Sequence, residues 1–241
     1  KIKKISRRSK FLLFFFNNNT VMLVHLGMTG KFFFINHKNN KYKTSFYYDI
    51  NEDKDKKHDR VIFHLSRNQK LIYNDVRKFG FIKFIKNINL KQNLHLKNLG
   101  PEPLEKKFNF SYFKQYIINK NRTIKDILMD QKFISGLGNI YVNETLFFSG
   151  IKPTKKVKNL SEGEIRKIIK FIKRILSKAI ALGGSSIKNF SSDNGKKGLF
   201  QQYFCVYGKK GEKCSKKSCG SNIIKIVISN RATFYCGKCQ K

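Results

Sequence analysis

Short apolar runs, each ended by a polar turn, follow one another along the N-terminal part of the chain. They are Phe11–Phe16, Thr20–His25, Lys31–Ile35, Ser45–Tyr48, Arg60–Leu65, Lys70–Tyr73 and Phe79–Ile85. Aromatic and β-branched residues dominate these runs, and Asn, Gly or charged residues separate them. This spacing is typical of strands in an antiparallel sandwich or barrel. We therefore predict a β domain over residues 1–97, with the charged segment 51–59 as a loop.

The segment Leu99-Gly-Pro-Glu-Pro103 interrupts this pattern, because proline restricts its own backbone and that of the residue before it. Beyond it, apolar residues recur at helical spacing, first in 110–117, then in 124–128 and most clearly in 165–179. Ser161 and Glu164 form a capping box at the start of that last helix, and Gly183-Gly184 ends it. The pattern predicts a helical domain over residues 98–183.

The C-terminal part begins with a Gly-, Ser- and Asn-rich stretch, residues 184–203, which has few apolar anchors and is expected to form a loop. Residues 204–241 are expected to form a small separate unit. The fold class that follows is α+β and multidomain: an antiparallel β-sandwich, a helical domain, a loop and a terminal module.

Four cysteines in the terminal module have the spacing of a zinc site. Cys214-x4-Cys219 and Cys236-x2-Cys239 are two close pairs separated by an insert long enough for a β-hairpin, which can place four thiolates around one ion. Zinc binding would supply folding energy that so small a unit lacks. The alternative is four unrelated buried thiols. We expect one structural Zn²⁺, and we expect Cys205 simply to be packed.

The hairpin of this module is predicted to use Ile223–Ile228 and Ala232–Tyr235 as strands and Ser229-Asn230-Arg231 as its turn. A guanidinium at the tip of a rigid ribbon is well placed to bind a phosphate with two hydrogen bonds. From position alone, a plain exposed turn residue is an equally good interpretation of Arg231.

The net charge of the chain is +36, from 51 Lys and Arg against 15 Asp and Glu. A charge of this size favours a polyanionic partner, and nucleic acid gains affinity by releasing counterions. Lys, Asn, Ile and Phe are abundant throughout, so an AT-rich codon bias is an alternative source of the charge, and a membrane surface or ribosomal RNA stays open as a partner. No apolar run has transmembrane length and no signal peptide is visible. We expect a cytoplasmic protein that does not enter a membrane, and a monomer by default.

Several stretches together resemble one family, the bacterial formamidopyrimidine-DNA glycosylases. They are Arg7-Arg-Ser-Lys10, His25-Leu-Gly-Met-Thr-Gly30, Lys57-His-Asp59, Asn74-Asp-Val-Arg-Lys-Phe-Gly80, Leu99-Gly-Pro-Glu-Pro-Leu104, Asp130-Gln131, Gly136-Leu-Gly-Asn-Ile-Tyr141, Gly183-Gly-Ser-Ser186, Val206-Tyr-Gly208 and the cysteine module that ends at Gln240. They occur in the family's order and cover essentially the whole chain. The resemblance implies a β-sandwich, a helix–two-turns–helix domain and a zinc-finger hairpin.

The activity that the resemblance implies is base-excision DNA repair. A bifunctional glycosylase and lyase would remove oxidised purines, such as 8-oxoguanine and formamidopyrimidines, from double-stranded DNA and cleave the strand at the abasic site by β,δ-elimination. Its partner would be DNA that carries an oxidised purine or an abasic site, and a bacterial enzyme of this kind would associate with the nucleoid.

Three residues match the family's intercalating positions. Flipping a base out of the stack leaves a hole, and Met28 and Phe79 are suitable wedges to fill it, while Arg77 can stack on and hydrogen-bond the orphaned base. Without the resemblance, Met28 and Phe79 would be interpreted as core residues.

The remaining matched residues are implied to bind DNA or to help the elimination. Lys10, His25, His58, Lys120, Lys125 and Asn139 match DNA-contacting positions, and Gly184, Ser185 and Ser186 match the loop that closes over the damaged base. Asn139 is also expected to cap the N-terminus of a helix, where a phosphate is favoured. Lys10 would assist β-elimination and Arg231 δ-elimination. Lys125, taken alone, is one lysine among many.

The chain begins Lys1-Ile-Lys-Lys4 and has no counterpart of the family's N-terminal proline nucleophile or of the glutamate after it. We expect the chain as written to bind DNA without excising bases by the family mechanism, either because the sequence is a fragment or because the gene is eroding. Two alternatives belong to the same fold: a non-catalytic DNA-binding remnant, and an endonuclease VIII-type enzyme for oxidised pyrimidines. A basic ribosomal protein is a more distant one.

Overall fold

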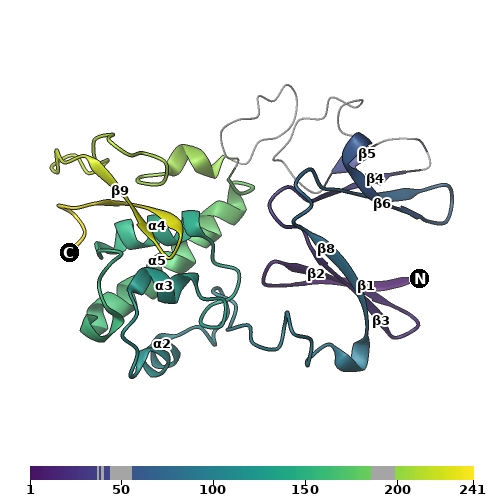
Figure 1. Cartoon of the computed structure of the whole chain (residues 1–241), viewed down its shortest axis with the longest axis horizontal. Coiled ribbons are helices and arrows are strands. Elements are labelled where there is room, and N and C mark those ends of the chain that lie inside the picture. The colour runs from purple at the N-terminus through teal and green to yellow at the C-terminus, as the bar shows by residue number, and fades with distance from the viewer. Residues whose placement is uncertain (37, 39–40, 44–55, 186–198) are drawn as a thin grey trace. The chain divides into compact units, whose positions relative to one another are not determined.

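The chain divides into two compact units in the computed structural model, which describes residues 1–36, 38, 41–43, 56–185 and 199–241. The first unit is built on Lys1–Lys97, and the second combines Asn98–Gly184 with Phe200–Lys241. Figure 1 shows strands in the first unit, and helices with a terminal hairpin in the second. The α+β class is therefore confirmed. The division of residues 98–241 at 183/184 and 203/204 stays a prediction, since both the helices and the hairpin lie in the second unit.

Two antiparallel four-stranded sheets make up the first unit (Figure 1). One has the order β1-β2-β3-β8, with β1 Ile2–Arg8, β2 Phe11–Phe16, β3 Thr20–His25 and β8 Phe81–Lys86. The other has the order β5-β4-β7-β6, with β4 Lys31–Ile35, β5 Lys41–Lys43, β6 Asp59–His64 and β7 Lys70–Asn74. The 3-10 turns η1 (Lys56–His58) and η2 (Asn87–Asn89) precede β6 and follow β8.

The two sheets pack face to face around a common core. Its buried members are Phe14, Met22, Val24, Phe32 and Tyr73, contributed by both sheets. On the opposite face of β3, Val21 and Leu23 are also buried, and Leu90 and Leu96 from the segment after β8 pack there. Because β2 and β3 are covered on both faces, their sequences are continuous apolar runs and do not alternate.

Some strands differ from the sequence expectation. β1 was not predicted, because its Lys and Arg residues hide the pattern, yet it pairs with β2 from Ile2↔Phe16 to Arg8↔Phe11. β8 begins at Phe81, so Phe79 belongs to the loop before it. The predicted strand at 45–48 lies outside the described residues.

The second unit contains α2 (Phe110–Ile117), α3 (Ile124–Met129), α4 (Asn139–Ser149) and α5 (Glu162–Ala181), with the 3-10 turns η3 (Val157–Asn159) and η4 (Phe200–Tyr203). The predicted capping box is present: Ser161 accepts from the Glu164 backbone, and the Glu164 side chain accepts from Ser161. Gly183 and Gly184 follow α5 with φ of 72° and 89°, the left-handed conformation that favours glycine.

The hairpin of β9 (Ile223–Ile228) and β10 (Arg231–Cys236) packs against α4 in this unit. The Asn143 side chain of α4 accepts a hydrogen bond from the Phe234 backbone N–H (2.7 Å), and Phe147 of α4 is buried in the apolar cluster of the hairpin. A larger cluster formed by α2, α3, α4 and α5 lies beneath. Within the part of the chain that the structure describes, no helix has the length and apolar character to cross a membrane.

Candidate nucleic-acid interface and metal centre

The four cysteines of the terminal module converge on one point. The Sγ atoms of Cys214, Cys219, Cys236 and Cys239 all lie within 4.8 Å of one another. Sγ of Cys214 is 3.9 Å from that of Cys239, and Sγ of Cys219 is 3.5 Å from that of Cys236. Thiolates held tetrahedrally at about 2.3 Å from one zinc ion lie about 3.8 Å apart. The donor set and its spacing therefore fit a metal ion.

The pKa values of these thiols are shifted in opposite directions. A hydrogen bond from the Ser221 backbone lowers the pKa of Cys219 to about 6. Burial raises the pKa of Cys239 to about 12 and that of Cys214 above its ordinary value. Thiols this close do not all ionise unless a bound cation offsets their mutual repulsion.

The hairpin turn consists of only two residues, Ser229 and Asn230, with φ of 47° and 58°. Two successive positive φ values are the signature of a type I′ turn, which matches the twist of a two-stranded ribbon. Arg231, expected in the turn, is the first residue of β10 and pairs with Ile228. Its exposed side chain thus extends from regular strand backbone and has a defined direction.

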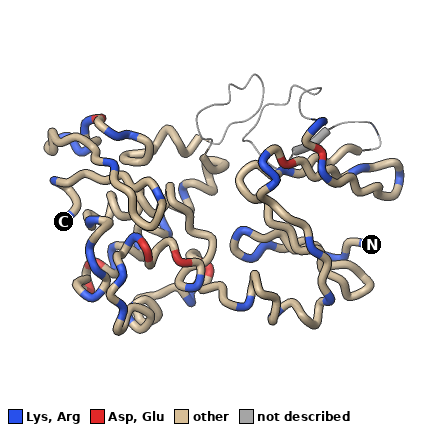
Figure 2. Tube along the Cα trace, viewed as in Figure 1, with Lys and Arg blue, Asp and Glu red and all other residues tan. Residues whose placement is uncertain are grey.

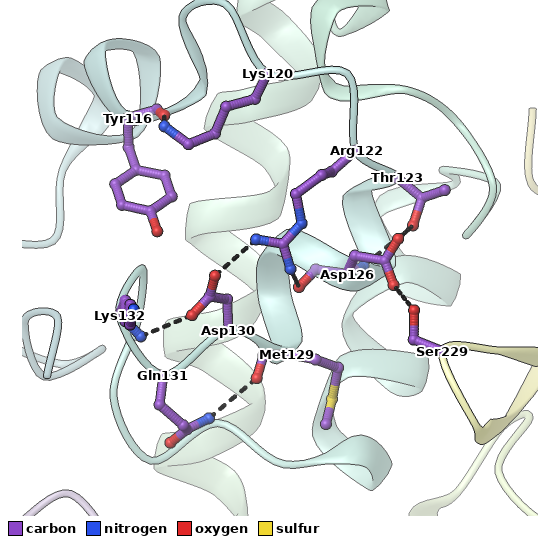
Figure 3. A network of polar contacts seen from close by, with 10 residues as sticks. All are labelled: Tyr116, Lys120, Arg122, Thr123, Asp126, Met129, Asp130, Gln131, Lys132 and Ser229. Carbon is purple, nitrogen blue, oxygen red and sulfur yellow. Dashed lines mark hydrogen bonds and ion pairs between the residues drawn. The ribbon is translucent and has the colours of Figure 1, made fainter. Parts of the chain in front are cut away.

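An open pocket of about 340 Å³ lies where this hairpin meets α3. It is lined by Arg122, Lys125, Asp126, Met129, Asp130, Gln131, Ile228, Ser229 and Arg231. We call it the cation pocket, since three basic residues, Arg122, Lys125 and Arg231, line it together with the carboxylates of Asp126 and Asp130. Figure 3 shows the hydrogen bonds that connect its rim, including the Arg122–Asp130 ion pair at 2.7 Å. Guanidinium and ammonium groups are the donors that bind phosphate with charge-assisted hydrogen bonds.

Lys125 has an unusual environment for a lysine. Only 1% of it is exposed, and its Nζ donates to Asn139 Oδ1 at 2.5 Å. Burial, helped by the charge of Arg231, lowers the pKa of Lys125 from 10.5 to about 7, although the carboxylate of Asp126 opposes the shift. Near neutral pH the amine is therefore divided between its charged and neutral forms, and a nearby anion would favour the charged form.

The expectation that Asn139 caps a helix is wrong. Gly138 is the N-cap of α4, without a side-chain hydrogen bond, and Asn139 is the first helical residue. The side chain of Asn139 instead accepts from Lys125 and donates to the Ala232 carbonyl of β10 (2.9 Å). It thus joins α3, α4 and the hairpin, a role that depends on contacts between distant segments and has no signature in the local sequence.

Lys120 does not line this pocket. Its Nζ donates to the Tyr116 carbonyl at 2.5 Å and lies 4.2 Å from the centroid of the Tyr116 ring. Figure 3 shows it beside Tyr116, on the side of α3 away from Ser229. In the second unit, the predicted residues Lys125, Asn139 and Arg231 therefore come together, and Lys120 stays apart.

In the first unit, Met28, Arg77 and Phe79 form an exposed cluster, which we call the wedge triad. Met28 is 63% exposed and Phe79 58%. The Arg77 guanidinium carbon lies 4.4 Å from the centroid of the Phe79 ring, and its Nη1 is 3.2 Å from the Met28 sulfur. Both side chains are accessible at the surface and contact the same guanidinium, so they form an exposed cluster and are not part of a core. The alternative that Met28 and Phe79 are core residues is therefore wrong.

The triad extends from two loops that a buried carboxylate holds together. Asp75 is 1% exposed and accepts hydrogen bonds from the Thr29 and Tyr73 hydroxyls and from the backbone N–H groups of Arg77 and Gly80. Burial alone would raise its pKa, but these hydrogen bonds outweigh burial and hold the pKa of Asp75 below its ordinary value. No role was predicted for Asp75 from the sequence, although this residue lies in the Asn74–Gly80 stretch.

Two glycines allow these loops to approach so closely. Gly27 has a φ of 62°, and its backbone N–H donates to His25 Nδ1 (3.1 Å). A Cβ on Gly80 would lie 1.9 Å from the Tyr73 hydroxyl, the group that hydrogen-bonds Asp75. Any side chain at Gly80 would therefore displace Tyr73 and loosen the support of the wedge triad.

The other predicted residues of the first unit lie in two places. His58 is close to the triad loops, since its carbonyl accepts the Asp75 backbone N–H at 3.0 Å. His25 stacks on Phe81, with centroids 5.8 Å apart, and its pKa is lowered by burial first and then by the nearby charge of Lys10. Lys10 and His25 are thus neighbours.

The predicted lesion loop is described only at its start. Gly184 accepts the backbone N–H of Phe200 at 3.0 Å, and Ser185, which is buried, forms a bridge with Leu199. Ser186 lies outside the described residues.

Lys and Arg occur on elements throughout both units, and Asp and Glu are few (Figure 2). Charge alone therefore does not single out a binding face. The cation pocket and the wedge triad are singled out by their side-chain contacts.

Comparisons with known protein sequences match both units of the chain. The family model described as the formamidopyrimidine-DNA glycosylase N-terminal domain matches residues 1–82, and the H2TH domain of the same glycosylase matches residues 99–191. A formamidopyrimidine-DNA glycosylase of Rickettsia bellii is 42% identical over 240 residues, covering 100% of this chain and 82% of the relative. One of Roseobacter denitrificans is 35% identical, covering 100% and 83%.

Solved structures are similar over the same extent. Lactococcus lactis Fpg in complex with DNA containing an abasic site is 36% identical and has a TM-score of 0.83, covering 100% of this chain and 82% of that one. A complex of the Lactococcus lactis protein with DNA containing Fapy-dG has a TM-score of 0.82 at the same identity and coverage.

Proposed function

Because the chain belongs to the formamidopyrimidine-DNA glycosylase family, it is a DNA glycosylase of base-excision repair, and we propose that its substrate is double-stranded DNA carrying an oxidised purine or an abasic site. The chemistry we propose is removal of 8-oxoguanine or a formamidopyrimidine, followed by strand cleavage through β,δ-elimination.

The wedge triad is the observation that carries this proposal. An enzyme that acts on a base first takes it out of the stack, and apolar side chains that enter the vacated space keep it open. Met28 and Phe79 are exposed and lie on loops fixed by a buried carboxylate, so they can enter a duplex without rearrangement of the unit. Arg77, already stacked on Phe79, can hydrogen-bond the base left without its partner.

DNA binding is the role we propose for Lys10, His25, His58, Lys120, Lys125, Asn139 and Arg231. The contacts of the second unit support it for three of them, because Lys125, Asn139 and Arg231 are linked around one pocket. After the base is lost, elimination breaks a bond between the sugar and a phosphate, and a fixed cation beside the departing oxygen lowers the barrier. We assign this help to Lys10 in the β-step and to Arg231 in the δ-step.

One structural zinc ion held by Cys214, Cys219, Cys236 and Cys239 belongs to the proposal. The ion would fold the hairpin and so fix Arg231, and it would take no part in the chemistry. Closure of the Gly184–Ser186 segment over the base, a monomeric state and a cytoplasmic, nucleoid-associated location stay predictions.

Borohydride trapping tests the proposed chemistry. The chain and a form extended upstream in its reading frame are incubated with duplexes that contain 8-oxoguanine or an abasic site, and sodium borohydride reduces any imine to a stable crosslink. We expect the extended form to give crosslinks and strand cleavage with the damaged duplexes, and none with undamaged DNA. Absence of crosslinks from both forms would contradict the lyase assignment, and equal binding of damaged and undamaged DNA would contradict the substrate.

A further inference from the structure

A side-chain hydrogen bond attaches the tip of the hairpin to helix α3. Ser229 Oγ donates to Asp126 Oδ1 at 2.5 Å, across 103 positions of sequence (Figure 3). Ser229 makes this contact from a left-handed backbone conformation, with a φ of 47°, which is unfavourable for residues other than glycine and is most tolerated by Asn and Asp. Turn geometry therefore gives no reason for a serine here, and the contact with Asp126 does.

The Asp126 carboxylate is itself held in place from the other side. Its Oδ2 accepts the Thr123 hydroxyl at 2.7 Å, and Thr123 is the N-cap of α3, whose Oγ1 accepts the Asp126 backbone N–H at 3.1 Å. Burial would raise the pKa of Asp126, but the hydrogen bonds from Ser229 and Thr123 and the charge of Arg122 lower it. One oxygen thus belongs to the helix cap, and the other is directed at the hairpin.

A second contact holds the hairpin just beyond Arg231. Asn139 donates to the Ala232 carbonyl at 2.9 Å and accepts from Lys125 at 2.5 Å. Arg231 is therefore bracketed, since Ser229 is held two positions before it and Ala232 one position after it. Lys125 directly precedes Asp126 in the chain. The peptide bonds of the two segments and the three hydrogen bonds that link Asp126 with Ser229, Ala232 with Asn139 and Asn139 with Lys125 therefore form a closed ring. Its members are Lys125, Asp126, Ser229, Asn230, Arg231, Ala232 and Asn139.

We propose that Asp126 and Ser229 are positioning residues, which hold the hairpin turn against α3 so that Arg231 stays beside Lys125 and both cations bind one DNA phosphate. The inference rests on the proposed function, because it assumes that DNA occupies the cation pocket. Neither residue is assigned a contact with the phosphate. Each acts through Arg231, whose long side chain would otherwise sample many positions at the tip of an untethered ribbon.

The pair Ser229→Gly and Asn230→Gly separates this role from turn stability. Both substitutions place glycine at a left-handed position of the same turn, and both relieve backbone strain. Only Ser229→Gly removes the contact with Asp126. Asn230 makes no side-chain hydrogen bond within the described residues, so Asn230→Gly is a matched control.

The first measurement is the affinity of the whole chain for a duplex with a tetrahydrofuran abasic site. Loss of a hydrogen bond to a charged group predicts binding about tenfold weaker for Ser229→Gly, and no change for Asn230→Gly. Ser229→Thr keeps the hydroxyl and is expected to recover part of the loss. In an Arg231→Ala background, Ser229→Gly should cause no further loss, because its effect passes through Arg231. Equal affinities of the two glycine variants, or additive losses in the double variant, would overturn the proposal.

The second measurement needs no DNA, and so distinguishes failure of this inference from failure of the proposed function. Burial is the largest cause of the lowered Lys125 pKa, the charge of Arg231 adds to it, and Asp126 opposes it. Arg122 and Asp130 also line the pocket. NMR titration of the Lys125 Nζ signal should give a higher pKa in Ser229→Gly than in the unaltered chain, and no shift in Asn230→Gly. An unchanged Lys125 pKa in Ser229→Gly would contradict the positioning role even if DNA binding were intact.

Discussion

The wedge triad and the cation pocket each depend on a carboxylate with a lowered pKa, but the two carboxylates are placed differently. Asp75 is 1% exposed, and its donors include two backbone N–H groups of the loop that it supports. Asp126 is half-buried, and it holds the hairpin through a hydroxyl of Ser229, which is exposed. The first support is part of the folded core, whereas the second joins two segments that are each folded by other means.

The two kinds of support fit the two tasks that we propose for these regions. A side chain that enters a base stack meets resistance, so its loop needs a support that cannot yield without loss of the surrounding fold. A cation that binds a phosphate needs a direction and a distance, which a surface contact is sufficient to provide. We therefore expect substitutions in the cation pocket to weaken DNA binding while the first unit stays folded. Substitution of Asp75 should both weaken DNA binding and destabilise the first unit.

The largest expected effect is loss of the metal site. Cys236→Ser, or treatment with a zinc chelator, should unfold the hairpin that carries Arg231 and weaken DNA binding by more than about 100-fold, because zinc supplies the folding energy of such modules. The first unit should remain folded. Metal analysis, NMR spectra and binding titrations check this. Cys205→Ser, at a thiol outside the cluster, is the control. A Cys236→Ser protein with one bound zinc and unchanged affinity would contradict the assignment.

The second largest effect is expected from Asp75→Asn, and it is an effect on the stability of the fold. The carboxylate of Asp75 accepts four hydrogen bonds, and an amide would place N–H donors against some of these donors. We therefore expect a loss of about 3 kcal/mol in the free energy of unfolding. Because the folded pKa of Asp75 lies below its ordinary 3.8, its contribution is present above that value and is lost as the pH falls below it.

Urea unfolding of the first unit, followed between pH 3 and 7, measures the contribution of Asp75. We expect the unaltered chain to lose more stability than Asp75→Asn over the acid range. Asp59→Asn is the control, since the Asp59 carboxylate accepts from Asn74 at 2.7 Å in the same unit. If the Asp75→Asn variant is as stable as the Asp59→Asn variant, the buried carboxylate does not support the wedge loops.

A smaller effect is expected from Arg77→Ala. The Arg77 side chain is exposed, so its loss should leave stability unchanged. Discrimination among the four bases opposite an abasic site should fall about tenfold, the size of one specific hydrogen-bonded contact to a base. Lys78→Ala, a neighbouring exposed cation, should lower affinity for all four duplexes alike. If Arg77→Ala keeps the discrimination of the unaltered chain, Arg77 does not contact the opposite base.

The smallest effect concerns pH. Lys125, with a pKa of about 7, is charged below that pH and neutral above it, so affinity for DNA should fall as the pH rises. A bound phosphate favours the charged form and moves the midpoint above 7. We expect Kd to increase about threefold between pH 6 and pH 9, and to be less dependent on pH in Lys125→Met. An identical pH dependence in Lys125→Met would show that the lysine does not meet the phosphate.

Features that depend on local sequence could be predicted. The cysteine spacing, the Ser161–Glu164 capping box and the apolar runs of β2, β3 and β4 each follow from residues close together in the chain, and each is present. The exposure of Met28 and Phe79 could not be derived from their chemistry, because lone apolar residues are usually buried. It followed from the resemblance to the family.

Features made by distant segments could not be predicted. Asp75 and Thr29 are 46 positions apart, and Asp126 and Ser229 are 103 apart. No pattern at either end indicates the contact. The lowered pKa of Lys125 has the same origin, since burial between α3, α4 and the hairpin causes it. Asn139 was assigned a cap for its position after Gly138, whereas its side chain serves two other segments.

Affinity for damaged and undamaged duplexes, measured in parallel, tests the central claim that the wedge triad recognises the lesion and the cation pocket binds the backbone. Met28→Ala/Phe79→Ala and Arg231→Ala are compared with the unaltered chain across a range of salt concentrations. The claim predicts that the wedge variant loses its preference for the abasic duplex. Arg231→Ala should bind both duplexes more weakly by the same factor, with a salt slope smaller by about one. A wedge variant that keeps its preference, or an Arg231→Ala protein that loses it, would contradict the account.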